Sequence, residues 1–357
     1  MKIGIIAPPW VPIPPLAYGG TELVIDTLAR GLSVAGHDVR LFASGDSTCP
    51  VPTEYLLEEA EGLQIANSTI EIRHLISAYE AFAEECDIIH DHTLIGPVFG
   101  PPRTNTPVVA TNHFPFSKDT AEVWRTVTKS SAKIISISNH HASLADSDIT
   151  VDQVIHHGVD TTRFPQGNGE GGYLAFLGRM VAEKGVHIAA RIARETGVPL
   201  KIAAKMREQP EKDYFEAEVK PLLGNGIEYI GEIGATDKLD LLSGAKALIN
   251  PIKWHEPFGM VMIESMACGT PVLVFPSGAA PEIVTDGLTG FVCEDEQEMI
   301  DSVGKIDELN RRACRWEVEN SFSMQRMVKD HVDFYQNVIA ENNKVLELDS
   351  KKKALVL

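Results

Sequence analysis

The stretch His255-Glu256-Pro257-Phe258-Gly259-Met260-Val261-Met262-Ile263-Glu264 places a carboxylate on each side of an expected helix start. Proline is favoured at the first position of a helix, because its missing N–H would have no partner there in any case. We therefore expect Glu256 in the loop just before the helix and Glu264 about two turns inside it. One carboxylate can then meet a ligand at the positive end of the helix, while the other meets a second part of the same ligand.

Short apolar runs alternate with helical patterns on both sides of this stretch. The segment 2–7 is typical of a buried parallel strand, 23–34 has the period of a helix, and 38–43 is a second strand. Such βαβ units build doubly wound parallel sheets, so we predict an α/β fold. Further strands are expected at 87–90, 107–111, 132–137, 153–156, 173–177, 200–203, 227–230, 247–250 and 271–275, and a helix at 185–196.

The chain length and one glycine-dense segment indicate two domains. A chain of 357 residues is long enough for two domains of ~150 residues each. The polar stretch 165–172 is rich in glycine and is typical of an interdomain hinge. We expect domains at 1–164 and 165–324, with the option that a C-terminal helix over 325–357 packs back onto the first domain. A ligand cleft between the two domains is the default expectation.

Composition disfavours several classes of partner. The formal net charge of −18 disfavours nucleic-acid binding, which relies on phosphate neutralisation by Lys and Arg. It also disfavours electrostatic membrane docking, as does an acidic series in the first domain that comprises Glu54, Glu58, Glu59, Glu61, Glu71, Glu80, Glu84 and Glu85. No apolar run approaches the ~20 residues of a transmembrane segment. Five scattered cysteines without a C-x-x-C pair favour reduced thiols, so we expect a soluble cytoplasmic protein.

The segment Gly178-Arg179-Met180-Val181-Ala182-Glu183-Lys184-Gly185 places two cations in a loop that leads into a helix. A lysine at a helix N-terminus is unfavourable, because the helix dipole is already positive there. A bound anion would reverse that sign, so Arg179 and Lys184 indicate a phosphate site. The alternative is that Glu183 offsets Lys184 and that both are solvated surface charges. The neighbouring pair of glutamates favours the phosphate site.

Taken together, these segments resemble the Glu-x7-Glu signature of retaining GT-B glycosyltransferases, the large family-4 group. The resemblance extends from Gly19-Gly20 to the segments 278–284 and 286–290, and so covers nearly the whole chain. It implies two Rossmann-like domains that face a central cleft. One departure is His157, which precedes Gly158 where the family usually has Asn.

The resemblance also implies roles for the residues of the second domain. Arg179 and Lys184 would bind the diphosphate of a nucleotide-sugar donor without a metal ion. Glu256 would contact hydroxyls of the donor sugar, and Glu264 would hold the ribose hydroxyls. The main-chain N–H groups of Phe258, Gly259 and Met260 would meet the sugar or the phosphate. Alternatively, Glu256 merely complements the helix dipole and Glu264 is an exposed helical carboxylate.

In the first domain, candidate residues follow two of the expected strands. Gly19 and Gly20 lack a Cβ and let the backbone approach a phosphate or sugar, although a plain turn is the alternative. By resemblance, His113 hydrogen-bonds the donor sugar, and the alternative is a loop histidine with a structural partner. His90 and His92 flank a strand residue and could share a metal, but no third ligand is fixed by spacing, so we assign no metal and no cofactor.

The resemblance implies a retaining hexosyltransferase that moves a sugar from a nucleoside-diphosphate sugar to an acceptor hydroxyl. Neither the base of the donor nor the acceptor can be derived from these residues. A sugar-nucleotide epimerase with the GT-B fold, or a noncatalytic nucleotide-sugar binding protein, are the alternatives. No G-x-G-x-x-G follows the first strand, which weakens a nicotinamide-dehydrogenase interpretation.

Overall fold

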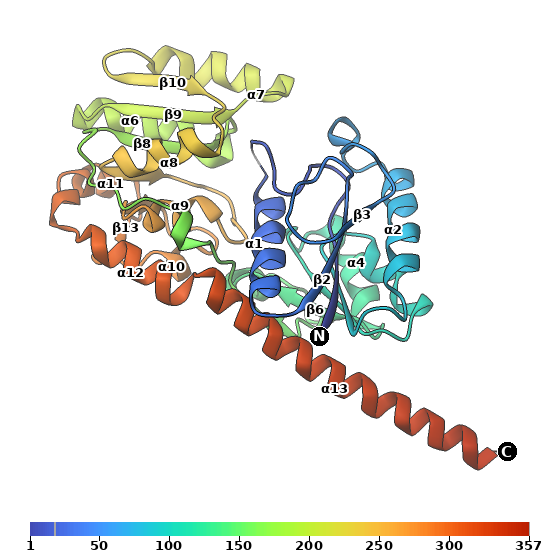
Figure 1. The fold of residues 1–357 in the computed structure, drawn as a ribbon. Helices are drawn as coiled ribbons and strands as arrows, with labels where there is room; N and C mark the ends of the chain where they lie inside the picture. The colour runs from blue at the N-terminus through green and yellow to red at the C-terminus, as the bar shows by residue number, and fades with distance from the viewer. Residues whose placement is uncertain (18, 357) are drawn as a thin grey trace.

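The computed structural model describes residues 1–17 and 19–356, so Leu357 of the expected C-terminal helix lies outside the described residues. The chain folds into two lobes, each built on one parallel sheet (Figure 1). The first sheet has seven strands in the order β3-β2-β1-β4-β5-β6-β7. Its strands are β1 (Lys2–Ile6), β2 (Asp38–Ala43), β3 (Thr53–Tyr55), β4 (Ile88–Asp91), β5 (Val108–Thr111), β6 (Lys133–Ser136) and β7 (Gln153–Val154).

The second sheet has six strands in the order β10-β9-β8-β11-β12-β13. Its strands are β8 (Leu174–Arg179), β9 (Leu200–Lys205), β10 (Ile227–Gly231), β11 (Ala247–Asn250), β12 (Val272–Val274) and β13 (Gly290–Val292). All neighbouring strands in both sheets are parallel. The predicted α/β class and the two Rossmann-like domains are thus confirmed.

Helices connect the strands and cover both sheets. The first lobe contains α1 (Gly20–Val34), α2 (Ser68–Phe82), α3 (Gly96–Phe99), α4 (Lys118–Thr128) and α5 (Asn139–Ser143). The second lobe contains α6 (Val186–Thr196), α7 (Gln209–Tyr214), α8 (Ala235–Gly244), α9 (Met260–Ala267), α10 (Ala280–Ile283), α11 (Glu296–Val303) and α12 (Arg311–Ser321). The last helix is α13 (Met324–Val356), and in the described part of the chain no helix combines the length and apolar character that crossing a membrane needs.

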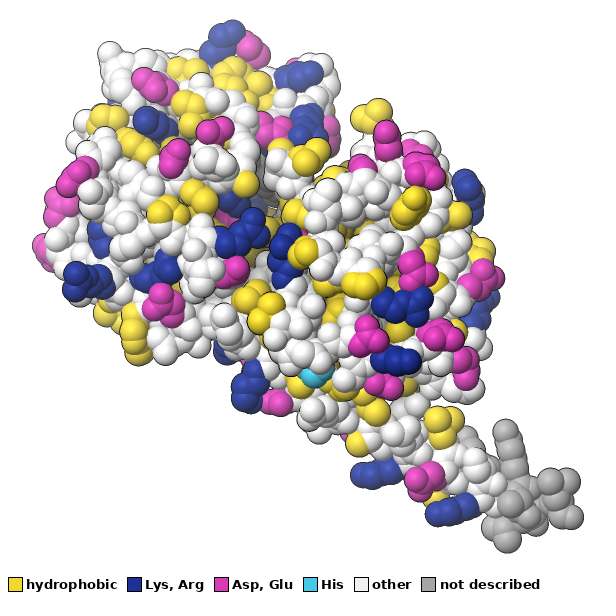
Figure 2. Space-filling view, in the orientation of Figure 1, with side chains coloured by type: hydrophobic (Ala, Val, Ile, Leu, Met, Phe, Trp, Pro, Cys, Tyr) yellow, Lys and Arg dark blue, Asp and Glu magenta, His cyan; other side chains and the backbone are white. Residues whose placement is uncertain are grey.

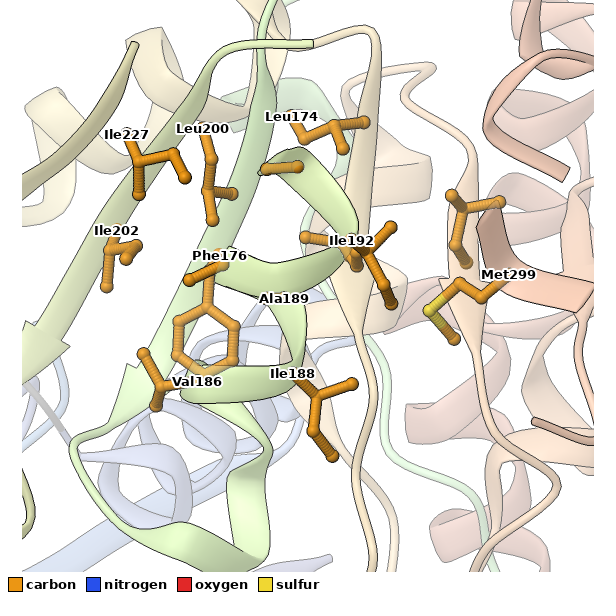
Figure 3. Close-up of a cluster of buried hydrophobic side chains, with 14 of the residues drawn as sticks. Leu174, Phe176, Val186, Ile188, Ala189, Ile192, Leu200, Ile202, Ile227 and Met299 are labelled. Atoms are coloured by element: carbon orange, nitrogen blue, oxygen red, sulfur yellow. The ribbon is translucent and has the colours of Figure 1, made fainter. Parts of the chain in front are cut away.

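The core of the second lobe lies between its sheet and α6. Val186 and Ile192 of this helix are fully buried, as are Phe176 of β8 and Ile202 of β9 (Figure 3). Burial of each such side chain contributes about 1.5–3 kcal/mol, so this layer holds the sheet and its helix as one unit. The loops at the carboxyl ends of the strands are therefore anchored to a rigid base.

The chain passes between the lobes just before the segment that the sequence indicates as a hinge. The N–H of Val159 donates to Phe322 O at 2.9 Å, and the N–H of Met324 donates to Val159 O at 2.9 Å. The glycine-rich stretch 165–172 instead packs on the second lobe, where Gly167 N donates to Cys268 O at 2.8 Å. Its glycines permit this close backbone contact, so their density reflects packing and not a free linker.

Helix α13 runs from beneath the second lobe along the first, and its end projects beyond it (Figure 1). The side chains of Met327, Val328, Tyr335 and Val338 belong to the core of the first lobe. The hydroxyl of Tyr335 lies 2.6 Å from Nδ1 of the buried His90. The first part of the C-terminal helix therefore belongs to the first lobe, although the chain has already passed through the second.

Close packing of α13 on α1 depends on Gly31. A Cβ at this position would lie 2.5 Å from Cγ2 of Val328 and 2.9 Å from Cγ of Met324. We predict that Gly31→Val destabilises the protein by about 2 kcal/mol, because overpacking displaces the helix. Thermal and urea unfolding would measure the loss. Ser33→Val, at an exposed position of the same helix, is the control, and equal stability of both variants would contradict this packing argument.

Candidate functional site

The candidate residues of the second lobe lie where the strand order of their sheet reverses. In the second sheet, successive strands run outward from β8 to β10 and then, from β11, in the opposite direction. Ligands of open α/β sheets bind outside the carboxyl ends of the strands at such a switch point. Arg179 ends β8, Lys184 follows it, and Glu256 lies in the loop after β11. Figure 2 shows a hollow between the lobes, with Lys and Arg side chains gathered at its edge.

Lys184 and Glu256, which come from different loops, form an ion pair in which both side chains are largely buried. The indole Nε1 of Trp254 donates to the same carboxylate oxygen, Oε2, at 2.8 Å. The Lys184 ammonium lies 5.3 Å from the centre of the Trp254 ring, within the range of a cation–π contact. The cation and the carboxylate expected at the donor site are thus brought together and held by a third side chain.

Gly278 explains how Glu256 is held in place. Its φ of +63° is in the left-handed region, and a Cβ there would lie 2.4 Å from both N and O of Glu256. The next residue, Ala279, donates its N–H to Glu256 O at 3.0 Å. A residue with a side chain at position 278 would therefore displace the backbone of Glu256, which accounts for the glycine in this loop.

The helix that carries Glu264 begins later than the sequence indicates. We expect Pro257 at the first helical position, but α9 starts at Met260, and Gly259 precedes it with a φ of +94°. This left-handed turn, which glycine adopts readily, ends the loop and separates Pro257 from the helix. Glu264 therefore lies little more than one turn inside the helix, and the expectation of two turns is wrong. The N–H groups of Phe258, Gly259 and Met260 lie at the helix start.

Arg179 is also paired with a carboxylate. Its Nη2 lies 3.2 Å from Oε1 of Glu211, a side chain that is almost fully buried. Burial alone would raise the pKa of Glu211, but the N–H groups of Arg207 and Glu208, together with Arg179, lower it. Glu211 therefore stays ionised and fixes the guanidinium at the end of β8.

Glu264 has a cationic partner that no sequence motif indicates. Its Oε1 accepts a hydrogen bond at 2.5 Å from Nζ of Lys238, which lies on α8. Glu264 itself is buried, so the alternative of an exposed helical carboxylate is wrong. Lys238 was not predicted, because its segment has no distinguishing motif. Trp254 directly precedes the stretch 255–264, but nothing in the sequence indicates that its indole bonds Glu256.

The first-lobe candidates lie in segments that follow β1 and β5. Gly19 and Gly20 form the start of α1, and a Cβ on Gly20 would meet no atom within 4 Å. His113 follows β5, and its Nε2 lies 2.9 Å from Nδ1 of the buried His92. Burial, with smaller contributions from His141 and His331, lowers the pKa of His113 to about 3. His113 is therefore neutral and can serve as a hydrogen-bonding group but not as a cation.

The histidine pair considered as a metal site has other partners. His90 bonds Thr111 Oγ1 through Nε2 at 2.8 Å and the hydroxyl of Tyr335 through Nδ1. Within residues 1–17 and 19–356, no group of three or more His, Cys, Asp or Glu side chains is arranged to hold a metal ion. His157, at the position of the usual Asn, stacks on His113 with ring centres 5.4 Å apart.

One carboxylate of the second lobe joins it to the first. Glu282 accepts hydrogen bonds from the N–H of Asn139, its side-chain Nδ2, the N–H of His140 and Nε2 of His156, at 2.5–2.9 Å. Nearby, the hydroxyl of Ser138 donates to Pro257 O at 2.6 Å. Burial alone would raise the pKa of Glu282, but these hydrogen bonds lower it to about 2.

We predict that Glu282→Gln destabilises the protein by about 2 kcal/mol at pH 7, the typical cost of losing hydrogen bonds to a charged group. The folded pKa of about 2 lies below the ordinary 4.5, so the stabilisation is complete above pH 4.5 and is lost as the pH falls toward 2. Chemical unfolding from pH 7 to pH 3 would measure this. A difference between the two proteins that is independent of pH would contradict the charge argument.

Two family models match adjacent parts of the chain. "Glycosyltransferase Family 4" matches residues 18–163, and "Glycosyl transferases group 1" matches residues 159–322. An MMP alpha-(1->4)-mannosyltransferase of Mycolicibacterium hassiacum is 24% identical over 90% of this chain and 95% of its own length. A glycogen synthase of Mycobacterium tuberculosis is 35% identical, over 39% of this chain and 35% of that protein.

Solved structures show the same fold. A sucrose-phosphate synthase from Thermosynechococcus elongatus has a TM-score of 0.79 at 17% identity and covers 96% of this chain and 100% of its own. Anabaena HepE, in complex with UDP and glucose, has a TM-score of 0.73 at 17% identity, over 94% of this chain and 99% of that one. The chain therefore belongs to the GT-B glycosyltransferases and is an enzyme of the hexosyltransferase type.

Proposed function

We propose that this glycosyltransferase moves a sugar from a nucleoside-diphosphate sugar to an acceptor hydroxyl, with retention of the anomeric configuration and without a metal ion. The observation that carries the proposal is the largely buried Lys184–Glu256 pair at the switch point of the second sheet. A cation and a carboxylate in contact at this place match the two parts of such a donor. One part is an anionic diphosphate and the other is a sugar with hydroxyl groups.

Donor binding would change the partners of these two side chains. The diphosphate would attract the ammonium of Lys184, and the carboxylate of Glu256, still held by Trp254, would accept hydrogen bonds from the sugar hydroxyls. Since each buried charge gains a new partner, the exchange avoids leaving an unpaired charge in the site. The Lys184–Glu256 contact would thus preserve the charge balance before the donor arrives.

The main barrier to transfer is charge separation, because positive charge develops on the sugar as the diphosphate departs. Preorganised cations and N–H groups that face the leaving group lower this barrier. Lys184, Arg179 and the N–H groups of Phe258, Gly259 and Met260 would supply them. The last three lie at the start of α9, where the helix dipole also favours an anion.

Retention requires the acceptor to attack from the face that the diphosphate leaves. The bond from C1 of the sugar to the phosphate oxygen breaks, and the acceptor oxygen bonds to C1. The acceptor proton passes to an oxygen of the departing diphosphate, so we assign no protein base. Neutral His113 would hydrogen-bond the donor sugar from the first lobe, and Gly19 and Gly20 would allow the α1 start to approach the diphosphate.

The relatives support a nucleotide sugar as the donor, but they do not identify the base of the donor for this chain. HepE has been solved with UDP, with UDP and glucose, and with UDP-glucose. The curated relatives include a mannosyltransferase and a synthase of alpha-maltose-1-phosphate. For this chain we propose a hexose donor and an acceptor that offers a free hydroxyl.

Nucleotide binding can be tested by thermal unfolding with UDP, GDP, ADP and dTDP, with NAD included to test for a redox enzyme. We expect one nucleoside diphosphate to raise the melting temperature, because it binds only the folded protein. Lys184→Ala should weaken that effect. Lys246→Ala is the control, since Lys246 pairs with the exposed Asp307 on the same lobe. Stabilisation by NAD alone, or by none of these ligands, would contradict the proposed donor site.

Turnover tests the role of Lys184 in the transition state. We predict that Lys184→Ala lowers kcat by about 100-fold, the typical loss when one group that stabilises developing charge is removed. Excess EDTA should leave the activity unchanged. Assays would follow nucleoside diphosphate release with and without an acceptor sugar. An EDTA-sensitive enzyme would refute metal independence. Release of nucleoside diphosphate without any acceptor would favour a hydrolase, whereas exchange of a sugar C–H proton with solvent would favour an epimerase.

A further inference from the structure

The carboxylate expected to meet the donor ribose is held by one side chain. Oε1 of Glu264 accepts from Nζ of Lys238 at 2.5 Å, and no other side chain of the described residues hydrogen-bonds this carboxylate. The side chain of Glu264 is 5% exposed and that of Lys238 is 21% exposed. Lys238 therefore reaches from the edge of the site to a buried acidic group.

The position of Lys238 is set by the first turn of α8. This helix begins at Ala235, and the N–H of Lys238 donates to Gly234 O at 3.0 Å. The helix packs beside α9, which carries Glu264. Both ends of the contact thus lie on regular helices, so the direction of the carboxylate is defined by the fold rather than by a mobile loop.

The charge on Glu264 would be unfavourable without Lys238. A buried carboxylate is costly unless it is paired and hydrogen-bonded. A bound nucleoside diphosphate would add negative charge in the same site and would increase the free-energy cost of the ionised carboxylate. Lys238 offsets both effects and occupies Oε1, which leaves Oε2 as an acceptor for hydroxyl groups.

We propose that Lys238 is a positioning residue that orients Glu264 toward the 2′ and 3′ hydroxyls of the donor ribose. The inference rests on the proposed function and narrows the donor to a ribonucleoside diphosphate sugar. A site built to hydrogen-bond a hydroxyl discriminates against the analogue that lacks it, because the buried acceptor is then left unpaired. A 2′-deoxynucleotide donor would bind more weakly for this reason.

The test compares a ribonucleotide with its 2′-deoxy counterpart by isothermal titration calorimetry. The probes are UDP and dUDP, GDP and dGDP, and ADP and dADP, and the pair used is the one whose ribonucleotide stabilises the unmodified protein. We expect the ribonucleotide to bind at least 10-fold more tightly than the deoxy form. Lys238→Met, which keeps the length but loses the charge, should weaken ribonucleotide binding about 10-fold and deoxynucleotide binding much less.

Two further variants separate positioning from a structural role. Lys238→Arg retains a cation and should restore most of the preference for the ribonucleotide. Lys246→Met removes the cation of the exposed pair with Asp307 and should leave both affinities unchanged. A merely structural role for Lys238 would lower the melting temperature of Lys238→Met and weaken both nucleotides equally.

The outcomes distinguish this inference from the proposed function. If Lys238→Met binds both nucleotides like the unmodified protein, or weakens both to the same extent, the positioning role is refuted. The donor site itself would stand in that case, provided that Lys184→Ala still weakens nucleotide binding. If none of the three ribonucleotides binds the unmodified protein but dTDP does, this inference fails and the donor site stands. If dTDP does not bind either, both proposals fail.

Discussion

The hydrogen bonds of Glu282 to the first lobe set the geometry on which the candidate site depends. The candidate site takes Lys184 and Glu256 from loops of the second lobe, and Gly20 and His113 from segments that follow strands of the first. A single carboxylate on α10 holds the start of α5 and the crossing segment at His156. Val159, in the segment where the chain first passes between the lobes, also bonds Phe322 and Met324 at the start of α13, where the chain passes back. The two passages between the lobes are therefore held together at one place.

Charge in the second lobe is arranged as pairs. The protein carries a net charge of −18, yet the loops after β8 and β11 and the start of α8 bring three cations together with three carboxylates. Breaking a buried pair is costly because it leaves a charge without a partner. A ligand that is anionic at one end and rich in hydroxyls at the other can replace the partners of both members. The proposed nucleotide sugar is a ligand of this kind, whereas a simple phosphate lacks the hydroxyl groups.

Much of the fold could be predicted from the sequence, because apolar strands and helical periods depend on neighbouring residues alone. The two parallel sheets and the loops that hold Arg179, Lys184 and Glu256 follow from that local pattern. The start of α9 could not be placed, because the left-handed turn at Gly259 takes precedence over the local preference of Pro257. Contacts between distant segments were also missed. Lys238 and Glu282 gain their roles from partners 26 and 126–143 positions away, which no local motif reveals.

The two lobes offer different chemistry to a ligand between them. Burial lowers the pKa of His92, His113 and His157, so these first-lobe groups are neutral at physiological pH. The second lobe instead presents paired full charges. Neutral hydrogen-bonding groups can bind a sugar without opposing the positive charge that develops on it, whereas cations are needed only where the diphosphate leaves. Separation of neutral and charged groups across the cleft therefore matches the separation of charge in the proposed reaction.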